Sequence, residues 1–252
     1  MDYVAIIQAR TGSTRLPNKV LMKLNGVSVI ESVLNQLSFS KNLTNKIVAT
    51  TINTSDDILI ELLKSMNVDY FRGNENDVLD RFYQCAKYFK INQIVRISSD
   101  APFIDPNIVD KTISFFNDSN FDYVNNFNIQ NRYPVGSEVE VFSFQTLETA
   151  WINAKKYSER EHVTPYIYNN PTKFKIGHLE YIEDLSKFHW TIDRSEDLEF
   201  ARTIYKKIKN KPILLENILD LLKKESELLD INKNIDSQEG YKKSLEEDKN
   251  HI

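Results

Sequence analysis

The chain has 252 residues, 41% of them hydrophobic, and its 32 Lys and Arg against 36 Asp and Glu give a formal net charge of -4. This size and composition suit one large α/β domain with a full core. The mildly acidic balance disfavours non-specific binding to nucleic acid or membrane surfaces. No apolar run of about 18 residues occurs, and the first expected strand begins too close to Met1 for a signal peptide. We therefore expect a cytoplasmic protein that contacts no membrane.

Short apolar segments rich in β-branched residues alternate with segments of helical periodicity in the first half of the chain. Strands are expected at residues 3–9, 47–51, 68–71 and 94–97. Helices are expected at 27–37, from 55 onward, at 78–89 and from 105 onward. This alternation predicts a mostly parallel sheet flanked by helices.

The pattern changes after about residue 120. Strands are expected at 139–144, 174–179 and 189–192, and helices at 147–154, 196–209 and 214–222. We expect residues 1–231 to form a single domain in which about 120–190 include a substrate-side subregion. Residues 232–252 are polar and charged, which predicts a loosely held C-terminal tail.

The segment after the first strand predicts a polyphosphate site. It combines three cations, a glycine and several hydroxyls, a composition that suits close contact with phosphate oxygens. The candidate phosphate-binding residues are Ala9, Arg10, Gly12, Ser13, Arg15 and Lys19. The alternative is a solvated basic loop after an edge strand. Neither the P-loop nor the dinucleotide-binding glycine pattern occurs in the chain.

Two acids at the ends of apolar segments are candidate ligands of a divalent cation. Asp100 follows the strand at 94–97, and Asp193 follows the segment at 189–192. Magnesium needs only one or two protein carboxylates when phosphate oxygens complete its coordination. The alternative for Asp100 is a turn before Pro102. The alternative for Asp193 is a helix cap, because its spacing to Glu196 is that of a capping box.

Six segments resemble, in order along the chain, the motifs of the sugar cytidylyltransferases, which include the 3-deoxy-manno-octulosonate and acylneuraminate enzymes. The segments are residues 6–19, 72–81, 99–103, 133–141, 160–166 and 191–198. Of these, residues 133–141 and 160–166 are most similar to the spore-coat polysaccharide F-type branch. The resemblance implies a Rossmann-like nucleotidyltransferase fold, CTP as co-substrate and Mg²⁺ held by Asp100 and Asp193. It is also compatible with a homodimer.

The resemblance assigns further roles along the chain. It implies that Arg10, Lys19 and Asp100 are catalytic and that Arg72 contacts the nucleotide. It places the acceptor sugar beside residues of the second half, namely Tyr133, Glu138, Glu140, Arg160 and His162. Spacing alone puts both glutamates on one face of an expected strand, where they would present a polar surface to a ligand.

We expect transfer of a CMP unit from CTP to a sugar acceptor, an acidic sugar or a sugar phosphate, with release of pyrophosphate, for surface polysaccharide or glycan biosynthesis. The choice of cytosine rests on the resemblance alone. One alternative is a metal-dependent glycosyltransferase, which predicts an Asp-x-Asp motif where this chain has Asp100 and Pro102. A second alternative is a non-catalytic partner in polysaccharide assembly.

Overall fold

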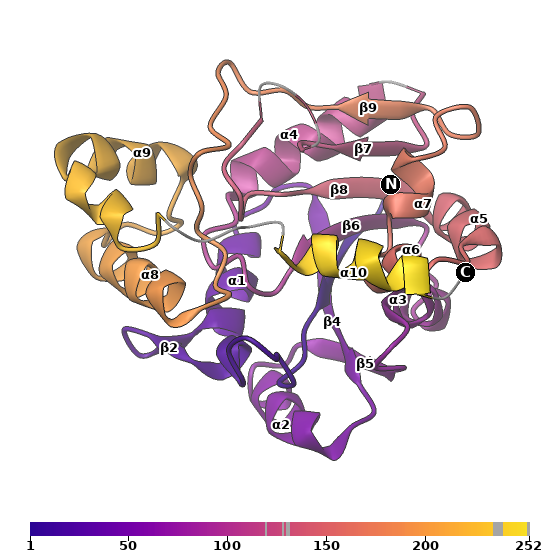
Figure 1. Cartoon of the computed structure of the whole chain (residues 1–252), viewed down its shortest axis with the longest axis horizontal. Helices are drawn as coiled ribbons and strands as arrows, with labels where there is room; N and C mark the ends of the chain where they lie inside the picture. Colours follow the sequence, from indigo (N-terminus) through magenta and orange to yellow (C-terminus); the bar gives the residue numbers. More distant parts are fainter. Residues whose placement is uncertain (119, 128, 130–131, 234–238, 251–252) are drawn as a thin grey trace.

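A central sheet with helices on both of its faces forms the body of the protein (Figure 1). The structure is a computed structural model that describes residues 1–118, 120–127, 129, 132–233 and 239–250. The seven strands lie in the order β5-β4-β1-β6-β8-β7-β9. Neighbours are parallel except β8, which runs antiparallel to β6 and β7. The expected mostly parallel, Rossmann-like α/β fold is confirmed.

The strands are short and their side chains alternate between the two faces of the sheet. The strands are β1 (Tyr3–Gln8), β4 (Leu43–Thr51), β5 (Asp69–Gly73), β6 (Gln93–Ser98), β7 (Tyr123–Asn125), β8 (Glu140–Ser143) and β9 (Ile176–His178). In β1, Ala5 and Ile7 enter one buried cluster, whereas Val4 and Ile6 enter another on the opposite face. Burial on both faces explains why the parallel strands read as continuous apolar runs.

Helices cover both faces of the sheet. The first cluster is covered by α1 (Val29–Leu37), α2 (Asp57–Ser65), α4 (Pro106–Asp118), α8 (Ser195–Lys207) and α9 (Leu215–Lys224). The second is covered by α3 (Val78–Tyr88), α5 (Phe144–Asn153) and α7 (Pro165–Tyr168). A small hairpin of β2 (Lys23–Leu24) and β3 (Val27–Ser28) precedes α1, which starts where Ser28 and Glu31 form a capping box.

The strand order reverses between β1 and β6. The connections through α1 and α2 lead to β4 and β5 on one side of β1, and α3 then returns the chain to β6 on the other side. Because the two neighbouring connections diverge here, a crevice opens beyond the carboxyl ends of β1 and β6. Open α/β sheets bind ligands at such a point.

The second half departs from the expectations in three places. The expected strand at 189–192 is not a strand; its one β-bridge joins His189 to Val135, which also lies outside the strands of the sheet. The strand expected up to residue 144 ends at Ser143, whose hydroxyl caps α5. The strand β7 was not expected, and its Tyr123 is buried in the second core cluster, whereas Tyr133 is buried in the first. These two aromatic side chains therefore belong to the core.

The C-terminal segment is not loosely held over residues 239–250. These residues form α10 (Glu239–Asn250), which packs against α6 (Tyr157–His162). Asp248 of α10 accepts hydrogen bonds from the backbone N and the Oγ of Ser158, at 2.8 and 2.5 Å. The helix is polar, as its composition indicates, but it has defined partners. Within the described residues, no helix is long and apolar enough to cross a membrane.

Candidate active site

A cavity of about 650 Å³ opens at the reversal point of the sheet. Its floor comes from the ends of β1 and β6, and its walls come from the loop after β1, from α3 and α6, from Asp193 and from α10. The expected residues that line it are Ala9, Arg10, Ser13, Arg15, Lys19, Asp100, His162 and Asp193. Two widely separated candidate motifs, the loop cations and the two acids, are therefore brought together.

The loop after β1 is fixed from below by a buried carboxylate. Asp56 accepts hydrogen bonds from the backbone N and the Oγ1 of Thr11, at 2.7 and 2.6 Å. The hydroxyls of Thr50 and Thr51 donate to its other oxygen. Asp56 directly precedes α2 but makes no capping hydrogen bond there. It instead ties the loop to the end of β4.

Asp56→Asn is expected to destabilise the protein by about 2–3 kcal/mol, the scale of disrupting hydrogen bonds to a buried charged group. Burial alone would raise the pKa of Asp56, but its hydrogen bonds from Thr11, Thr51 and Thr50 lower it below the ordinary 3.8. The carboxylate therefore contributes its stability above about pH 3.8, and the contribution is lost as the pH falls through the folded pKa. Urea unfolding from pH 7 to pH 3 measures both effects. The difference in unfolding free energy between the two proteins should shrink in acid, and a constant difference would contradict the assignment.

Backbone conformation in the loop depends on Asn18 more than on Gly12. Asn18 has a φ of 59°, in the left-handed region, directly before the 3₁₀ turn η1 (Lys19–Leu21). Gly12 does not line the cavity, and its φ lies outside that region. A Cβ at Gly12 would lie 3.6 Å from Glu75 Oε1, an ordinary contact. The left-handed backbone position in this loop is therefore at Asn18, and asparagine tolerates this conformation better than most residue types.

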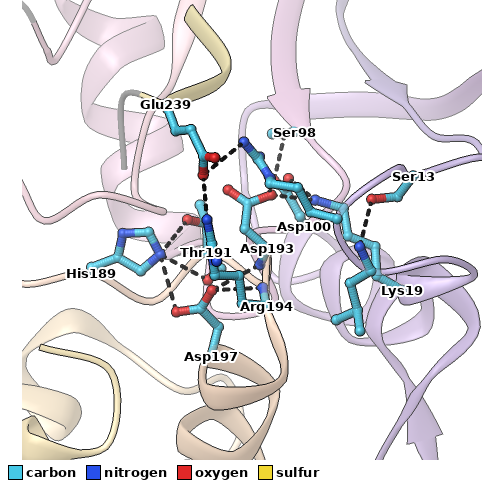
Figure 2. Close-up of polar contacts among 12 residues, drawn as sticks. Ser13, Lys19, Ser98, Asp100, His189, Thr191, Asp193, Arg194, Asp197 and Glu239 are labelled. Atoms are coloured by element: carbon cyan, nitrogen blue, oxygen red, sulfur yellow. Dashed lines mark hydrogen bonds and ion pairs between the residues drawn. The ribbon is translucent and has the colours of Figure 1, made fainter. Parts of the chain in front are cut away.

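Lys19 joins the two predicted metal ligands. Its Nζ lies 2.6 Å from Asp100 Oδ2 and 2.8 Å from Asp193 Oδ1, and Figure 2 shows both acids converging on it. Arg15 Nη2 lies 2.6 Å from the same oxygen of Asp193. Burial opposes the charge on Lys19, but the two carboxylates raise its pKa overall. One compact cluster at the reversal point thus contains two acids and two cations, namely Asp100, Asp193, Lys19 and Arg15.

Hydrogen bonds around the two acids decide between the alternatives left open by the sequence. Ser98 Oγ donates to Asp100 Oδ1 at 2.6 Å, so this carboxylate points along β6 toward the cavity. The cap of α8 is not made by Asp193. Asp197 instead accepts from the backbone N of Asp193 and of Arg194, at 3.0 and 2.9 Å. The Asp193 carboxylate is left for Lys19 and Arg15, which lower its pKa against the effect of burial.

The donor set suits a hard divalent cation that also binds phosphate. Two carboxylates from distant parts of the chain converge on one point, and oxygen ligands of this kind are those that Mg²⁺ uses beside a polyphosphate. Within the described residues, no group of three or more His, Cys, Asp or Glu side chains could hold a metal ion by itself. A cation at this point would therefore need oxygens from a bound substrate.

Several residues expected to contact a ligand are engaged elsewhere. Arg72 does not line the cavity; its guanidinium donates to the carbonyls of Thr51 and Asn53 and to Asp57. Arg160 binds Asp77 at the start of α3 and the carbonyl of Trp151. In this structure both side chains are thus engaged by protein groups, and their contact with a ligand stays a prediction.

The two glutamates do not present a shared polar face. Glu140 is buried and accepts from Arg96, from Tyr123 Oη and from Thr164 Oγ1. Glu138 bonds the backbone N of Gly136 at 2.7 Å, and burial raises its pKa. Neither lines the cavity, and neither does the buried Tyr133. Period-two spacing predicted a common face but could not show that the face is internal.

His162 does line the cavity, as a neutral imidazole. Burial and the nearby Arg96 lower its pKa to about 4, although Asp248 opposes the shift. Its Nε2 lies 2.9 Å from Ser244 Oγ of α10. At neutral pH it can therefore offer a hydrogen bond but no positive charge.

The cavity is also lined by side chains that sequence reasoning did not identify. They are Gln8, Arg81, Arg96, Ser98, Tyr157, Glu161 and the α10 residues Glu239, Gly240, Lys243, Ser244 and Glu247. Arg96 binds Gln8 Oε1 at 3.1 Å and forms the buried ion pair with Glu140. An arginine within the apolar strand β6 was the one available signal, because a charge in a central strand needs a partner.

This combination of sheet order, cationic loop and paired acids is that of a Rossmann-like nucleotidyltransferase fold. Comparison with known proteins identifies the family. Residues 4–239 match the family model described as cytidylyltransferase, and the chain belongs to this family. The resemblance found in the motifs is thus confirmed, including the similarity to the spore-coat branch.

Three relatives illustrate the match. An uncharacterized protein of Methanocaldococcus jannaschii is 43% identical over 244 residues, which cover 96% of this chain and 98% of that protein. Spore coat polysaccharide biosynthesis protein SpsF of Bacillus subtilis is 34% identical over 84% of this chain and 89% of its own length. The structure of a cytidylyltransferase from Leptospira borgpetersenii has a TM-score of 0.86 and 32% identity, over 94% of this chain and 98% of that one.

Proposed function

We propose that the protein transfers CMP from CTP to a sugar acceptor and releases pyrophosphate. The observation that carries this proposal is the convergence of Lys19, Arg15, Asp100 and Asp193 at the reversal point of the sheet. Membership in the cytidylyltransferase family supports CTP as the nucleotide. The similarity to the spore coat polysaccharide biosynthesis protein SpsF supports a sugar acceptor and a role in surface polysaccharide biosynthesis.

The loop cations would bind the triphosphate. Arg10, Arg15 and Lys19 all line the cavity, and their carboxylate partners keep them oriented before substrate binds. Charge builds up on the β- and γ-phosphates as pyrophosphate departs, so cations fixed beforehand stabilise the transition state at little reorganisation cost. Arg10 is held by Glu75 and Glu161 at 3.5 and 3.8 Å, distances that leave it free to turn toward a phosphate.

Asp100 and Asp193 would hold Mg²⁺ when the substrate supplies the remaining oxygens. The ion would offset charge on the α-phosphate and lower the pKa of a bound acceptor hydroxyl. Ser98 and Asp197 would support the two acids without contacting the ion. Ser98 orients the Asp100 carboxylate through a hydrogen bond, and Asp197 orients the Asp193 backbone. No general base is required if the acceptor is already ionised, and holding the acceptor in line with the α-phosphorus supplies much of the rate.

Pyrophosphate release measured with each of the four nucleoside triphosphates, Mg²⁺ and a panel of acceptors tests the proposal. The panel includes 3-deoxy-manno-octulosonate, N-acetylneuraminate and hexose 1-phosphates. We expect pyrophosphate and a CMP-sugar only with CTP and at least one acceptor. Release of a nucleoside diphosphate or CMP from a nucleotide sugar would favour the glycosyltransferase. Binding of CTP without turnover of any acceptor would favour the non-catalytic partner.

The cytoplasmic location and the homodimer stay predictions. CTP and Mg²⁺ are both cytoplasmic, which supports the first. Light scattering on the purified protein measures its molar mass in solution and so tests the homodimer.

A further inference from the structure

Helix α10 forms one wall of the cavity, although the family match ends at its first residue, 239. The residues that it contributes lie three or four positions apart and therefore share one helix face. They are Glu239, Gly240, Lys243, Ser244 and Glu247. The side of α10 that faces the cavity is thus polar and carries both signs of charge.

Three contacts hold α10 in this position. Glu239 binds Arg194 at 2.8 Å at one end, as Figure 2 shows. Asp248 binds Ser158 at the other end, and Ser244 meets His162 between them. The helix backbone is therefore fixed with respect to both α6 and α8.

Lys243 differs from the other cations of the cavity. Arg10, Arg15, Lys19 and Arg96 each face a carboxylate, and Arg81 donates to backbone carbonyls. Lys243 is exposed and lines the cavity, but it makes no hydrogen bond or ion pair within the described part of the chain. An unpaired ammonium on a fixed helix is available to an anionic ligand.

The neighbours of Lys243 lie on the β6 side of the cavity. The next residue, Ser244, bonds His162, and the nearby charge of Arg96 affects the pKa of that histidine. The triphosphate cations come from the loop after β1, whose Arg15 meets the start of α10 at Glu239, 3.9 Å away. Lys243 lies one turn further along the helix, away from this contact, and we assign that part of the cavity to the acceptor.

We propose that Lys243 is a substrate-binding residue that contacts an oxyanion, a carboxylate or a phosphate, of the acceptor sugar. This inference rests on the proposed function for the identity of the second substrate. It makes α10 a determinant of acceptor charge, so acidic or phosphorylated sugars are the expected acceptors and neutral sugars are not.

Lys243→Gln tests the proposal, with Lys249→Gln as the matched control because Lys249 is exposed on the same helix and does not line the cavity. Calorimetry measures binding of CTP, 3-deoxy-manno-octulosonate, N-acetylneuraminate and glucose 1-phosphate to each protein. We expect Lys243→Gln to weaken one acidic or phosphorylated sugar about 10- to 100-fold, the range of a charge-assisted hydrogen bond. CTP binding should change less than twofold, and the control should match the wild type.

Comparing the three sugars shows whether Lys243 binds a carboxylate or a phosphate. The group is a carboxylate in 3-deoxy-manno-octulosonate and N-acetylneuraminate and a phosphate in glucose 1-phosphate. Where turnover is measurable, the loss should appear in the KM for the acceptor and not in kcat. The proposal is overturned if the wild type binds none of these sugars, if the variant binds them unchanged, or if only CTP binding falls. Sugar binding through Lys243 without release of pyrophosphate would refute the proposed function but not this inference.

Discussion

Asp100→Asn is expected to lower kcat for CMP transfer by about 10³-fold, on the scale of removing one preorganised electrostatic group from an active site. The amide keeps the shape of the side chain but loses the charge that faces Lys19 at 2.6 Å. Asp193→Asn should cost a similar factor. The double variant should lose much less than the product of the two factors, because residues that act on one ion or one cluster are not additive.

Titration with Mg²⁺ separates a metal role from a purely electrostatic one. The wild type should lose activity with a chelator and regain it with Mg²⁺, whereas the residual activity of Asp100→Asn should need a higher Mg²⁺ concentration. Asp220→Asn is the control, since Asp220 is exposed on α9 at 63%. Wild-type turnover in Asp100→Asn, or activity that does not depend on a divalent cation, would remove these carboxylates from the mechanism.

The core of the fold could be predicted because local pattern and burial agree there. Strands buried on both faces show as apolar runs, and the helices between them show a clear apolar face. The second half was harder, since β7 and β9 have three residues each and pair with distant segments. The segment before Asp193 contains apolar residues but forms only an isolated bridge, to Val135 outside the sheet strands, which its sequence could not show.

In the candidate site, too, some residues could be predicted from the sequence and others could not. Arg10, Lys19, Asp100 and Asp193 were identifiable because each follows an apolar segment whose end lies at the reversal point. Arg72 and Arg160 share the residue type of a phosphate ligand, yet each is directed by a nearby acid, Asp57 or Asp77. The sequence of helix α10 resembles a loosely held tail because it is polar and charged and has no apolar face. Its place depends on polar contacts with residues about 80 to 90 positions earlier.

Glu140→Ala is expected to destabilise the protein by about 3–5 kcal/mol, because it leaves the buried guanidinium of Arg96 without a counter-charge. Arg96 already has its Nε unpaired, and Tyr123 and Thr164 would each lose an acceptor as well. Chemical unfolding at pH 7 measures the loss. Glu227→Ala is the control, since this glutamate is exposed and should change stability by less than about 0.5 kcal/mol.

A double replacement, Arg96→Met with Glu140→Leu, separates stability from activity. Apolar pairs often replace buried ion pairs without loss, so the double variant should recover the part of the stability lost to the uncompensated charge, but not the hydrogen bonds from Tyr123 and Thr164. It should still turn over poorly, because Arg96 lines the cavity and holds Gln8 at the end of β1. Full activity in the stable double variant would show that the ion pair serves packing alone. Low activity with wild-type stability would place Arg96 among the residues that position the substrates.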